Sequence, residues 1–318
     1  MVHLRPHPVA FPDMSPFLVG VDVGGTNLRA IRCRPNGRIE ARARRETRAK
    51  EGWDAVAAGI ADLAAAVSGG RRPAAVGVCV PASVDALSGV VAGRCKIPGG
   101  PDYPLARALK RLFASSPLRD SPIAIENDAN AAAWGEFTFG AGRGCQSLLA
   151  ITLGTGVGGG FVLDGRLYRG PDGSAGETGH LVVRPEGRKC PCGRRGCLEA
   201  YGGARALVRT AQGIAATPAD LARLARKGSK KALAAFRLYG AALGIASATL
   251  VNLLNPDRIV FTGGIAQSFR FFAPVIREEV ERRALRRAGL RVRIVRGLLG
   301  DDAGALGAAT LAGEAFPP

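Results

Sequence analysis

The sequence predicts an α/β fold in which two related domains face one cleft. Apolar, strand-like runs alternate with helix-like segments along the chain, which is typical of α/β proteins. Two glycine-rich loops, 20–27 and 153–160, each separate one apolar run from another, so each is interpreted as a tight turn between two strands. The pattern restarts after Asn127, and the second loop therefore repeats the first in a second half of the chain.

The first half is expected to form one α/β unit. Its strands are predicted within 17–33, around the first loop, and over 37–46, 74–80 and 123–126, with helices over 53–67 and 104–113. The alanine-rich segment 53–67 is amphipathic and lies between two strand regions, so it is interpreted as a helix that covers the sheet.

The second half is expected to form the other unit. It opens with a helix over 129–137 and the hairpin strands 148–153 and 160–163. Further along come helices within 205–226 and over 230–254, a strand over 258–262, a helix near 271–287, a strand over 291–295 and a closing small-residue helix over 304–313. The order again alternates strands and helices, as an α/β domain requires.

Composition narrows the classes of partner. A chain of 318 residues can form two domains with ample cores. The net charge of +18 is compatible with nucleic-acid binding, but 37 of the 44 basic residues are arginines, and these are scattered. That bias fits GC-rich coding, so no nucleic-acid partner is expected, although a basic field still attracts anionic phosphates.

Neither membrane association nor secretion is predicted. We identify no apolar run as long as a membrane span, and residues 1–16 lack the apolar core of a signal peptide. Segment 1–16 is expected to be a disordered tail, and the protein to be soluble and cytoplasmic. Four of the seven cysteines, Cys33, Cys79, Cys95 and Cys145, lie singly and are interpreted as reduced core residues.

The two glycine-rich loops predict a polyphosphate site between the halves. Glycines let backbone N–H groups approach a ligand closely, and phosphate is the usual ligand of such an array. Thr26 and Thr155 add hydroxyl donors, and the carboxylate of Asp22 is suited to Mg²⁺ beside the phosphates. A buried, turn-capping role is the structural alternative for Asp22. The residues expected to bind nucleotide and phosphate are Asp22, Gly24, Gly25, Thr26, Asn27, Gly154, Thr155, Gly156, Gly263 and Gly264.

A cluster of one histidine and three cysteines predicts a zinc site. His180, Cys190, Cys192 and Cys197 supply one imidazole and three thiols, a closed set suited to tetrahedral Zn²⁺. Four protein ligands leave no open position, so the zinc is expected to be structural rather than catalytic. The alternative, free thiols in a loop, is disfavoured because the histidine and the close cysteine spacing come together with turn-forming glycines.

Asp128 follows a predicted strand and opens the next helix, so its carboxylate lies near a helix N-terminus. From the residue pattern alone, helix capping is the favoured interpretation. The positive end of the helix is expected to keep this carboxylate ionised.

Several motifs together resemble the ROK family of sugar kinases, within the actin/Hsp70/hexokinase-like ATPase superfamily. They are the first loop, Glu-Asn-Asp-Ala-Asn at 126–130, the second loop, Gly-Glu-Thr-Gly-His at 176–180, the cysteine motif 190–199 and Thr-Gly-Gly at 262–264. The match runs over about 18–312. It implies two ribonuclease-H-like (actin-like ATPase) domains around a central cleft, with a small zinc-binding segment at 177–199. The domains would be 17–126, joined by the returning C-terminal helix 304–318, and 127–303.

The same resemblance implies a function and roles for residues. It implies ATP- and Mg²⁺-dependent phosphorylation of a hexose, with glucose at O6 the first choice, and Asp128 as the general base. Asp128 need only be a weak base, since phosphoryl transfer depends mainly on positioning and charge neutralisation. The sugar-binding residues it implies are Ser83, Asn127, Glu177, His180 and Glu199. The histidine would use one ring nitrogen for zinc and the other for sugar, and a homodimer is expected.

The sequence departs from the family in the sugar-side loop. Where the family often has Gly-x-Pro-Gly and then Asn-Leu-Pro-Gly-Trp, this chain has Val-Pro-Ala-Ser at 80–83 and Lys-Ile-Pro-Gly-Gly at 96–100. Lys96 in place of asparagine favours an anionic or otherwise altered substrate.

The alternatives that stay open are of several classes. Fructose, mannose and N-acetylhexosamines are possible acceptors, and polyphosphate is a possible donor. A sugar-responsive ROK regulator is a second class, disfavoured because about 16 residues before the first strand are too few for a helix-turn-helix domain. An actin- or Hsp70-like conformational ATPase is a third class, and it gives no reason for the cysteine cluster.

Overall fold

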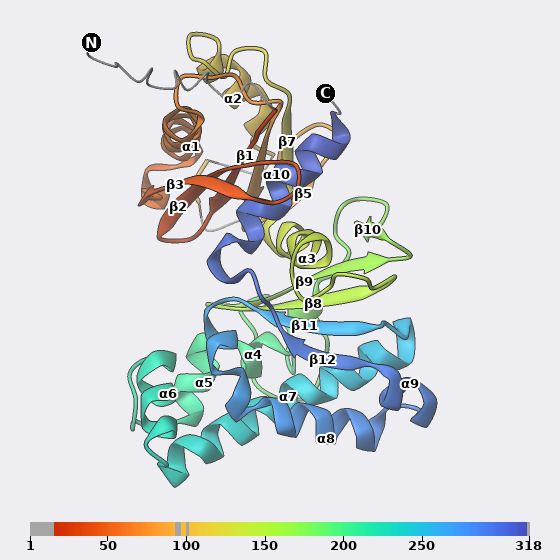
Figure 1. The fold of residues 1–318 in the computed structure, drawn as a ribbon. Helices are drawn as coiled ribbons and strands as arrows, with labels where there is room; N and C mark the ends of the chain where they lie inside the picture. The colour runs from red at the N-terminus through yellow and green to blue at the C-terminus, as the bar shows by residue number, and fades with distance from the viewer. Residues whose placement is uncertain (1–15, 93–96, 100–101, 317–318) are drawn as a thin grey trace, which may run out of the picture.

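Two five-stranded sheets with helices around them form the molecule, one above the other in Figure 1. The computed structural model describes residues 16–92, 97–99 and 102–316. The predicted N-terminal tail, Cys95 and Lys96 therefore lie outside the described residues, apart from residue 16. We call the first sheet with its helices the N-terminal lobe and the second sheet with its helices the C-terminal lobe.

The N-terminal lobe is built on the strand order β3-β2-β1-β4-β7, in which β1–β2 and β2–β3 are antiparallel and β4 and β7 are parallel to β1. Its strands are β1 Leu18–Val23, β2 Asn27–Cys33, β3 Ile39–Glu46, β4 Ala75–Val80 and β7 Ile123–Asn127, with the small β5 Ser83–Asp85 and β6 Val90–Ala92 pair beside them. Helices α1 (Trp53–Ser68) and α2 (Leu105–Phe113) share one apolar core with this sheet. The last helix, α10 (Ala303–Ala315), packs on its other face.

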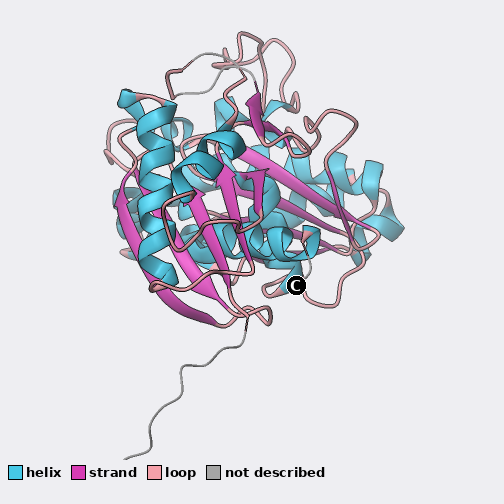
Figure 2. Cartoon of the chain, turned by 90° about the horizontal axis from the view of Figure 1, so that it is seen from above, coloured by secondary structure: helices cyan, strands magenta, loops and turns pink. Residues whose placement is uncertain are grey.

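The C-terminal lobe repeats this topology. Its order β10-β9-β8-β11-β12 again reads third, second, first, fourth and fifth strand along the chain. The strands are β8 Leu148–Leu153, β9 Val157–Leu163, β10 Arg166–Tyr168, β11 Arg258–Thr262 and β12 Arg293–Arg296. Its helices are α3 Asp128–Thr138, α4 Glu199–Gly202, α5 Ala204–Thr210, α6 Pro218–Arg226, α7 Lys230–Leu254, α8 Ala273–Arg283 and α9 Arg286–Arg291, with the 3-10 helices η2 Thr178–His180 and η3 Gly264–Phe271. Two short 3-10 helices lie elsewhere: η1 Ala49–Glu51 precedes α1 in the N-terminal lobe, and η4 Gly300–Asp302 leads into α10. Figure 2 shows the twisted strands between the helices. The predicted α/β fold and its repeat are thus confirmed.

Glycines let α10 approach its neighbours backbone to backbone. A Cβ at Gly307 would lie 1.7 Å from the carbonyl oxygen of Ala131 in α3, and a Cβ at Gly20 of β1 would lie 1.9 Å from that of Ala305. Neither contact leaves room for any side chain. α3 and α10 therefore pack directly against each other where the two lobes meet (Figure 1).

Some element boundaries differ from the prediction. The helical region 205–226 divides into α5 and α6, because Gly213 takes a positive φ and Thr217 caps a new helix that has Pro218 at its start. The region 271–287 divides into α8 and α9 at Ala284, whose backbone is extended. The second strand of the second hairpin begins at Val157, three residues earlier than expected.

One helix corrects a statement made from the sequence. By length and composition α7 could cross a membrane, since it has 25 residues and a mean hydropathy of 1.4, so an apolar run of that length does exist. In the fold, 67% of its apolar window is buried inside the C-terminal lobe, as in the core helix of a globular domain. Three of the single cysteines, Cys33, Cys79 and Cys145, are buried free thiols, as predicted.

Candidate active site

Asp128 is the first residue of α3, and Asn127 rather than Asp128 caps the helix. The Asn127 Oδ1 atom accepts hydrogen bonds from the N–H groups of Ala129 and Asn130, at 2.9 and 3.1 Å. The interpretation of Asp128 as the capping residue is therefore wrong. Its carboxylate is left for another role at the start of the helix.

The electrostatics of Asp128 also differ from the prediction. Burial raises the pKa of its carboxyl from 3.8 to about 7, and repulsion from Asp22 and Glu177 acts in the same direction. Hydrogen bonds from the first backbone N–H groups of α3 lower the pKa but do not compensate. The helix N-terminus thus does not keep this carboxyl fully ionised at neutral pH. A carboxyl with a pKa of about 7 is well matched to general base catalysis.

Asp22 stands at the end of β1, in the N-terminal lobe. Burial raises the pKa of its carboxyl, and Arg29, with Nη1 3.5 Å from Oδ2, opposes that rise. The same guanidinium lies 3.3 Å from Asp301, in η4 before α10. The Cys79 thiol lies 3.6 Å from Asp22 Oδ1. A buried carboxylate with one partly exposed arginine is compatible with a cation close by, and the donor set fits Mg²⁺.

The two glycine loops come from opposite lobes. In the first, the Gly24 N–H donates to the Asn27 carbonyl at 3.0 Å, the Thr47 hydroxyl donates to the Gly24 carbonyl at 2.6 Å, and Thr26 is exposed at the tip. In the second, the Gly154 N–H donates to the Gly156 carbonyl at 3.1 Å, and Thr155 is exposed. Both turns thus have the form that the sequence predicts.

Open space lies beside three of the glycines. Apart from the glycine itself and the chain adjoining it, no described atom lies within 4 Å of the position that a Cβ would take at Gly25, Gly154 or Gly264. The Thr-Gly-Gly turn 262–264 forms a third loop, in which Gly263 has φ 87° and packs against the backbone of Leu153. This third loop therefore lies beside the second loop at the end of β8. A ligand can therefore approach the backbone at all three loops.

Glu199 connects the cysteine segment with the second loop. Its Oε2 atom accepts a hydrogen bond from the Val157 N–H at 3.1 Å, and a Cβ at Gly156 would lie 2.2 Å from the same oxygen. A side chain at position 156 would therefore displace this carboxylate from its present position. The structure brings together a predicted sugar residue and a predicted phosphate loop.

The predicted zinc ligands lie in one group. The ligand atoms of His180, Cys190, Cys192 and Cys197 are all within 4.8 Å of one another. The Cys192 and Cys197 sulfurs are 3.7 Å apart, which is about the edge of a tetrahedron with Zn–S bonds of about 2.3 Å. The residues present therefore fit Zn²⁺.

His180 faces two ways. Its Nδ1 atom lies 3.9 Å from the Cys190 sulfur, whereas its Nε2 atom lies 3.8 Å from Glu177 Oε2. One ring nitrogen is thus placed for metal and the other for a polar ligand beside Glu177. Because Glu177 and Asp22 both interact electrostatically with Asp128, these three acids from the two lobes lie near one another.

Asn127 and Ser83 lie near each other. The Asn127 Nδ2 group donates to the Ala82 carbonyl at 3.1 Å, and Ser83 follows Ala82 at the start of β5. One N–H of the Asn127 amide is then left for a ligand.

Glu126 and Arg169 were not assigned roles from the sequence. Glu126 is 6% exposed and accepts from the Arg169 guanidinium at 2.7 Å and from the Asn130 amide at 3.0 Å. This ion pair joins the end of β7 to the segment after β10 and so ties the two lobes together beside Asp128. A lone acid in the apolar strand 123–126 was the available signal, but its partner is 43 residues away in sequence.

Two lobes of one topology, each with a glycine turn between its first two strands, define an α/β protein of the actin-like ATPase type. The chain belongs to the ROK family, whose model matches residues 18–315. A glucokinase from Thermotoga maritima is 35% identical over 314 residues, covering 93% of this chain and 97% of that protein. The solved structure of a ROK family glucokinase from Streptomyces griseus, in complex with glucose and AMPPNP, has a TM-score of 0.81 and 32% identity, covering 94% of this chain and 99% of the other. The xylose repressor of Bacillus spizizenii is 32% identical over 246 residues, which are 76% of this chain and 61% of the repressor.

Proposed function

We propose that this protein is an ATP-dependent glucokinase that transfers the γ-phosphoryl group of ATP to O6 of glucose, with Asp128 as general base. The observation that carries the proposal is the position of Asp128, at the start of α3, where its pKa is raised to about 7 and the acids Asp22 and Glu177 lie close by. A base of that pKa takes the proton of the attacking hydroxyl as the bond to phosphorus forms. The proton leaves the sugar oxygen, and ADP leaves with the electrons of the broken P–O bond.

The sugar contacts are proposed from the groups around this base. Glu177, Glu199 and the Nε2 atom of His180 are free to accept from or donate to vicinal hydroxyls. The remaining amide N–H of Asn127 and the hydroxyl of Ser83 lie on the N-terminal side. Such contacts hold the reacting hydroxyl near Asp128, and positioning supplies a large part of the rate of phosphoryl transfer.

The phosphate contacts are proposed from the loops. The backbone of 24–27 from one lobe and of 154–156 from the other would hold the polyphosphate, and Gly263 and Gly264 would contact the nucleoside. Asp22 would hold Mg²⁺, which neutralises charge on the phosphate oxygens when bound. Zn²⁺ bound by His180 and the three cysteines would fix the ring of His180, and through the same segment Glu177 and Glu199.

The proposal also covers the domain boundaries, the oligomeric state and the location of the protein. We assign 17–126 with 304–318 to one domain and 127–303 to the other, supported by the packing of α10 on the first sheet. A homodimer is proposed because exposed leucines of α7 and α9, Leu253 and Leu290 among them, give an apolar surface. The use of ATP supports a cytoplasmic location. We propose neither a nucleic acid nor a membrane as a partner.

A regulator of transcription is the second candidate, because the xylose repressor is similar in sequence to 76% of this chain. A regulator binds sugar without turning nucleotide over. The test is ADP release with ATP and Mg²⁺ over a panel of hexoses and N-acetylhexosamines, with polyphosphate as an alternative donor at low and moderate salt. We expect hexose-dependent ADP release that is greatest with glucose. Sugar binding without ADP release would favour the regulator, and a higher kcat/KM with polyphosphate at moderate salt would show that the donor is misassigned.

A further inference from the structure

The ion pair between Arg169 and Glu126 lies close to Asp128, and none of the roles proposed above includes it. Arg169 follows β10 in the C-terminal lobe, and its Nε atom donates to Glu126 Oε2, near the end of β7, at 2.7 Å. The side chain of Glu126 is 6% exposed, whereas that of Arg169 is 36% exposed. A buried carboxylate of the N-terminal lobe is thus balanced by a half-buried arginine of the C-terminal lobe.

The other oxygen of Glu126 holds the start of α3. Its Oε1 atom accepts from the Asn127 N–H at 2.9 Å and from the Asn130 Nδ2 group at 3.0 Å. Asp128, the first residue of α3, lies between these two residues in sequence. One carboxylate therefore connects Arg169 with residues on both sides of the proposed base.

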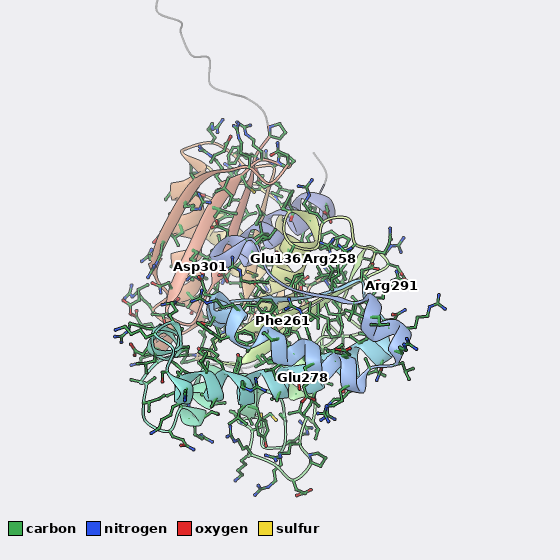
Figure 3. The ribbon with its side chains drawn as sticks, turned by 60° about the horizontal axis from the view of Figure 1, so that its bottom comes forward. Glu136, Arg258, Phe261, Glu278, Arg291 and Asp301 are labelled. Atoms are coloured by element: carbon green, nitrogen blue, oxygen red, sulfur yellow. The ribbon has the colours of Figure 1, made fainter. Side chains whose placement is uncertain are left out.

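The rest of α3 is held in place without Arg169. Glu136, which is labelled in Figure 3, is fully buried near the other end of the helix and accepts from the N–H groups of Leu298 and Leu299 at 3.0 and 2.9 Å. Between the two ends, α3 packs directly against α10. Loss of the Arg169 side chain is therefore expected to loosen the first turn of α3 and to leave the remainder of the helix where it is.

The turn that begins at Arg169 leads to Glu177, one of the proposed sugar ligands. The Arg169 carbonyl accepts from the Ala175 N–H at 3.0 Å, which closes the turn. A Cβ at Gly173 would lie 2.5 Å from the Val84 carbonyl oxygen in β5, so the turn also touches the N-terminal lobe. Because backbone atoms make both contacts, replacing the Arg169 side chain is expected to leave Glu177 in position.

We propose that Arg169 is a positioning residue that, through Glu126, fixes the direction of the Asp128 carboxylate during phosphoryl transfer. This inference rests on the proposed function. Without the guanidinium, Glu126 is a buried charge with no cation beside it, which is costly, so its carboxylate turns toward water. That movement breaks the hydrogen bonds to Asn127 and Asn130, and a displacement of about 1 Å in a catalytic site costs about 10²-fold in rate.

The test compares kcat with the Kd for glucose at pH 8 in the full-length protein. Arg169→Met keeps the length of the side chain and removes its charge. We expect kcat to fall at least tenfold while the Kd for glucose, measured by calorimetry without nucleotide, stays within threefold of the wild type. Arg169→Lys keeps a positive charge and should recover most of the lost kcat. Arg166→Met, the same change at an exposed arginine of β10, is the matched control and should leave both values unchanged.

The double variant Glu126→Gln/Arg169→Met separates positioning from a general loss of contacts. The glutamine amide carries no charge that needs a cation, and its carbonyl oxygen can accept both hydrogen bonds that Glu126 Oε1 accepts now. We therefore expect the double variant to have a kcat severalfold above that of Arg169→Met. If the two side chains only contributed separately to stability, their losses would add and the double variant would be the worse of the two.

Thermal unfolding without ligands accompanies each measurement. The inference fails if kcat of Arg169→Met stays within twofold of the wild type, if glucose affinity and melting temperature fall in step with kcat, or if the double variant is no faster than Arg169→Met. Each of these outcomes leaves the proposed function standing, because the wild type still releases ADP in response to hexose. A wild type without hexose-dependent ADP release would refute the proposed function and this inference with it.

Discussion

Replacing Asp128 by asparagine tests the base and its environment in one variant. Asparagine keeps the shape of the side chain and one acceptor oxygen, but it cannot take a proton. We expect kcat to fall about 10²–10⁴-fold, the usual value of a general base, while the Kd for glucose changes little. A variant that keeps a tenth or more of wild-type kcat would show that Asp128 is not the base.

The same substitution is expected to stabilise the fold at high pH. Burial raises the pKa of Asp128 from 3.8 to about 7, so the folded state holds this proton more tightly than the unfolded state does. That contribution to stability is fully present below pH of about 4 and is lost as pH rises through about 7. A difference of about three pKa units corresponds to about 4 kcal/mol, the cost of ionising the buried carboxyl at pH 8. Asparagine never incurs this cost.

The assay is thermal unfolding of wild type and Asp128→Asn at pH 5 and pH 8, without nucleotide or sugar. By the same linkage the variant gains about 4 kcal/mol at pH 8 and about 1.5 kcal/mol at pH 5, so its Tm advantage grows by several degrees with pH. Asp62→Asn is the control, because it makes the same chemical change on a side chain that is 68% exposed. An advantage for Asp128→Asn that is equal at both pH values would refute the burial argument.

Three further outcomes are expected. Asp22→Ala should raise the Mg²⁺ concentration needed for half-maximal rate and lower turnover, with glucose affinity changed far less. If a Mg²⁺ titration at saturating glucose is superimposable on that of the wild type, Asp22 does not hold Mg²⁺. Metal analysis should find about one zinc per chain. Cys192→Ser should weaken glucose binding before it unfolds the lobe, whereas Cys145→Ser, outside the cluster, should leave glucose binding unchanged. Normal glucose binding by zinc-free Cys192→Ser would disprove the coupling between zinc and glucose binding. Gly307→Ala should lose roughly 1–3 kcal/mol of stability because its Cβ would meet the Ala131 carbonyl at 1.7 Å. Gly289→Ala in α9, where the nearest atom is the Ala284 Cβ at 3.3 Å, should change stability less; equal melting temperatures for both would contradict the packing.

Local pattern was enough to predict most elements and the turns that carry the site. Glycine loops between apolar runs identify both hairpins, because few other sequences make such turns between strands. The cluster around His180 was also readable, since its ligands are close in sequence and their number suits one metal.

Other features depend on distant parts of the chain. The pKa of Asp128 depends on burial between two lobes, whereas the local pattern shows only the helix N-terminus, which acts in the opposite direction. Asn127 takes the capping role because its amide also reaches the Ala82 carbonyl in another segment. Glu136 is an ordinary helix residue in sequence, and its partners at Leu298 and Leu299 come together with it only after the chain returns from β12.

The return of α10 to the first sheet sets an order of events during synthesis. The strands of the N-terminal lobe are complete once β7 has been made, but the helix that covers their second face is made only after β12, the last strand of the C-terminal lobe. Residues from α3 to β12 are continuous in sequence and can fold before that helix exists. The first sheet must therefore wait with Leu18 and Ile31 uncovered until α10 arrives, and the lobe that is synthesised first is completed last.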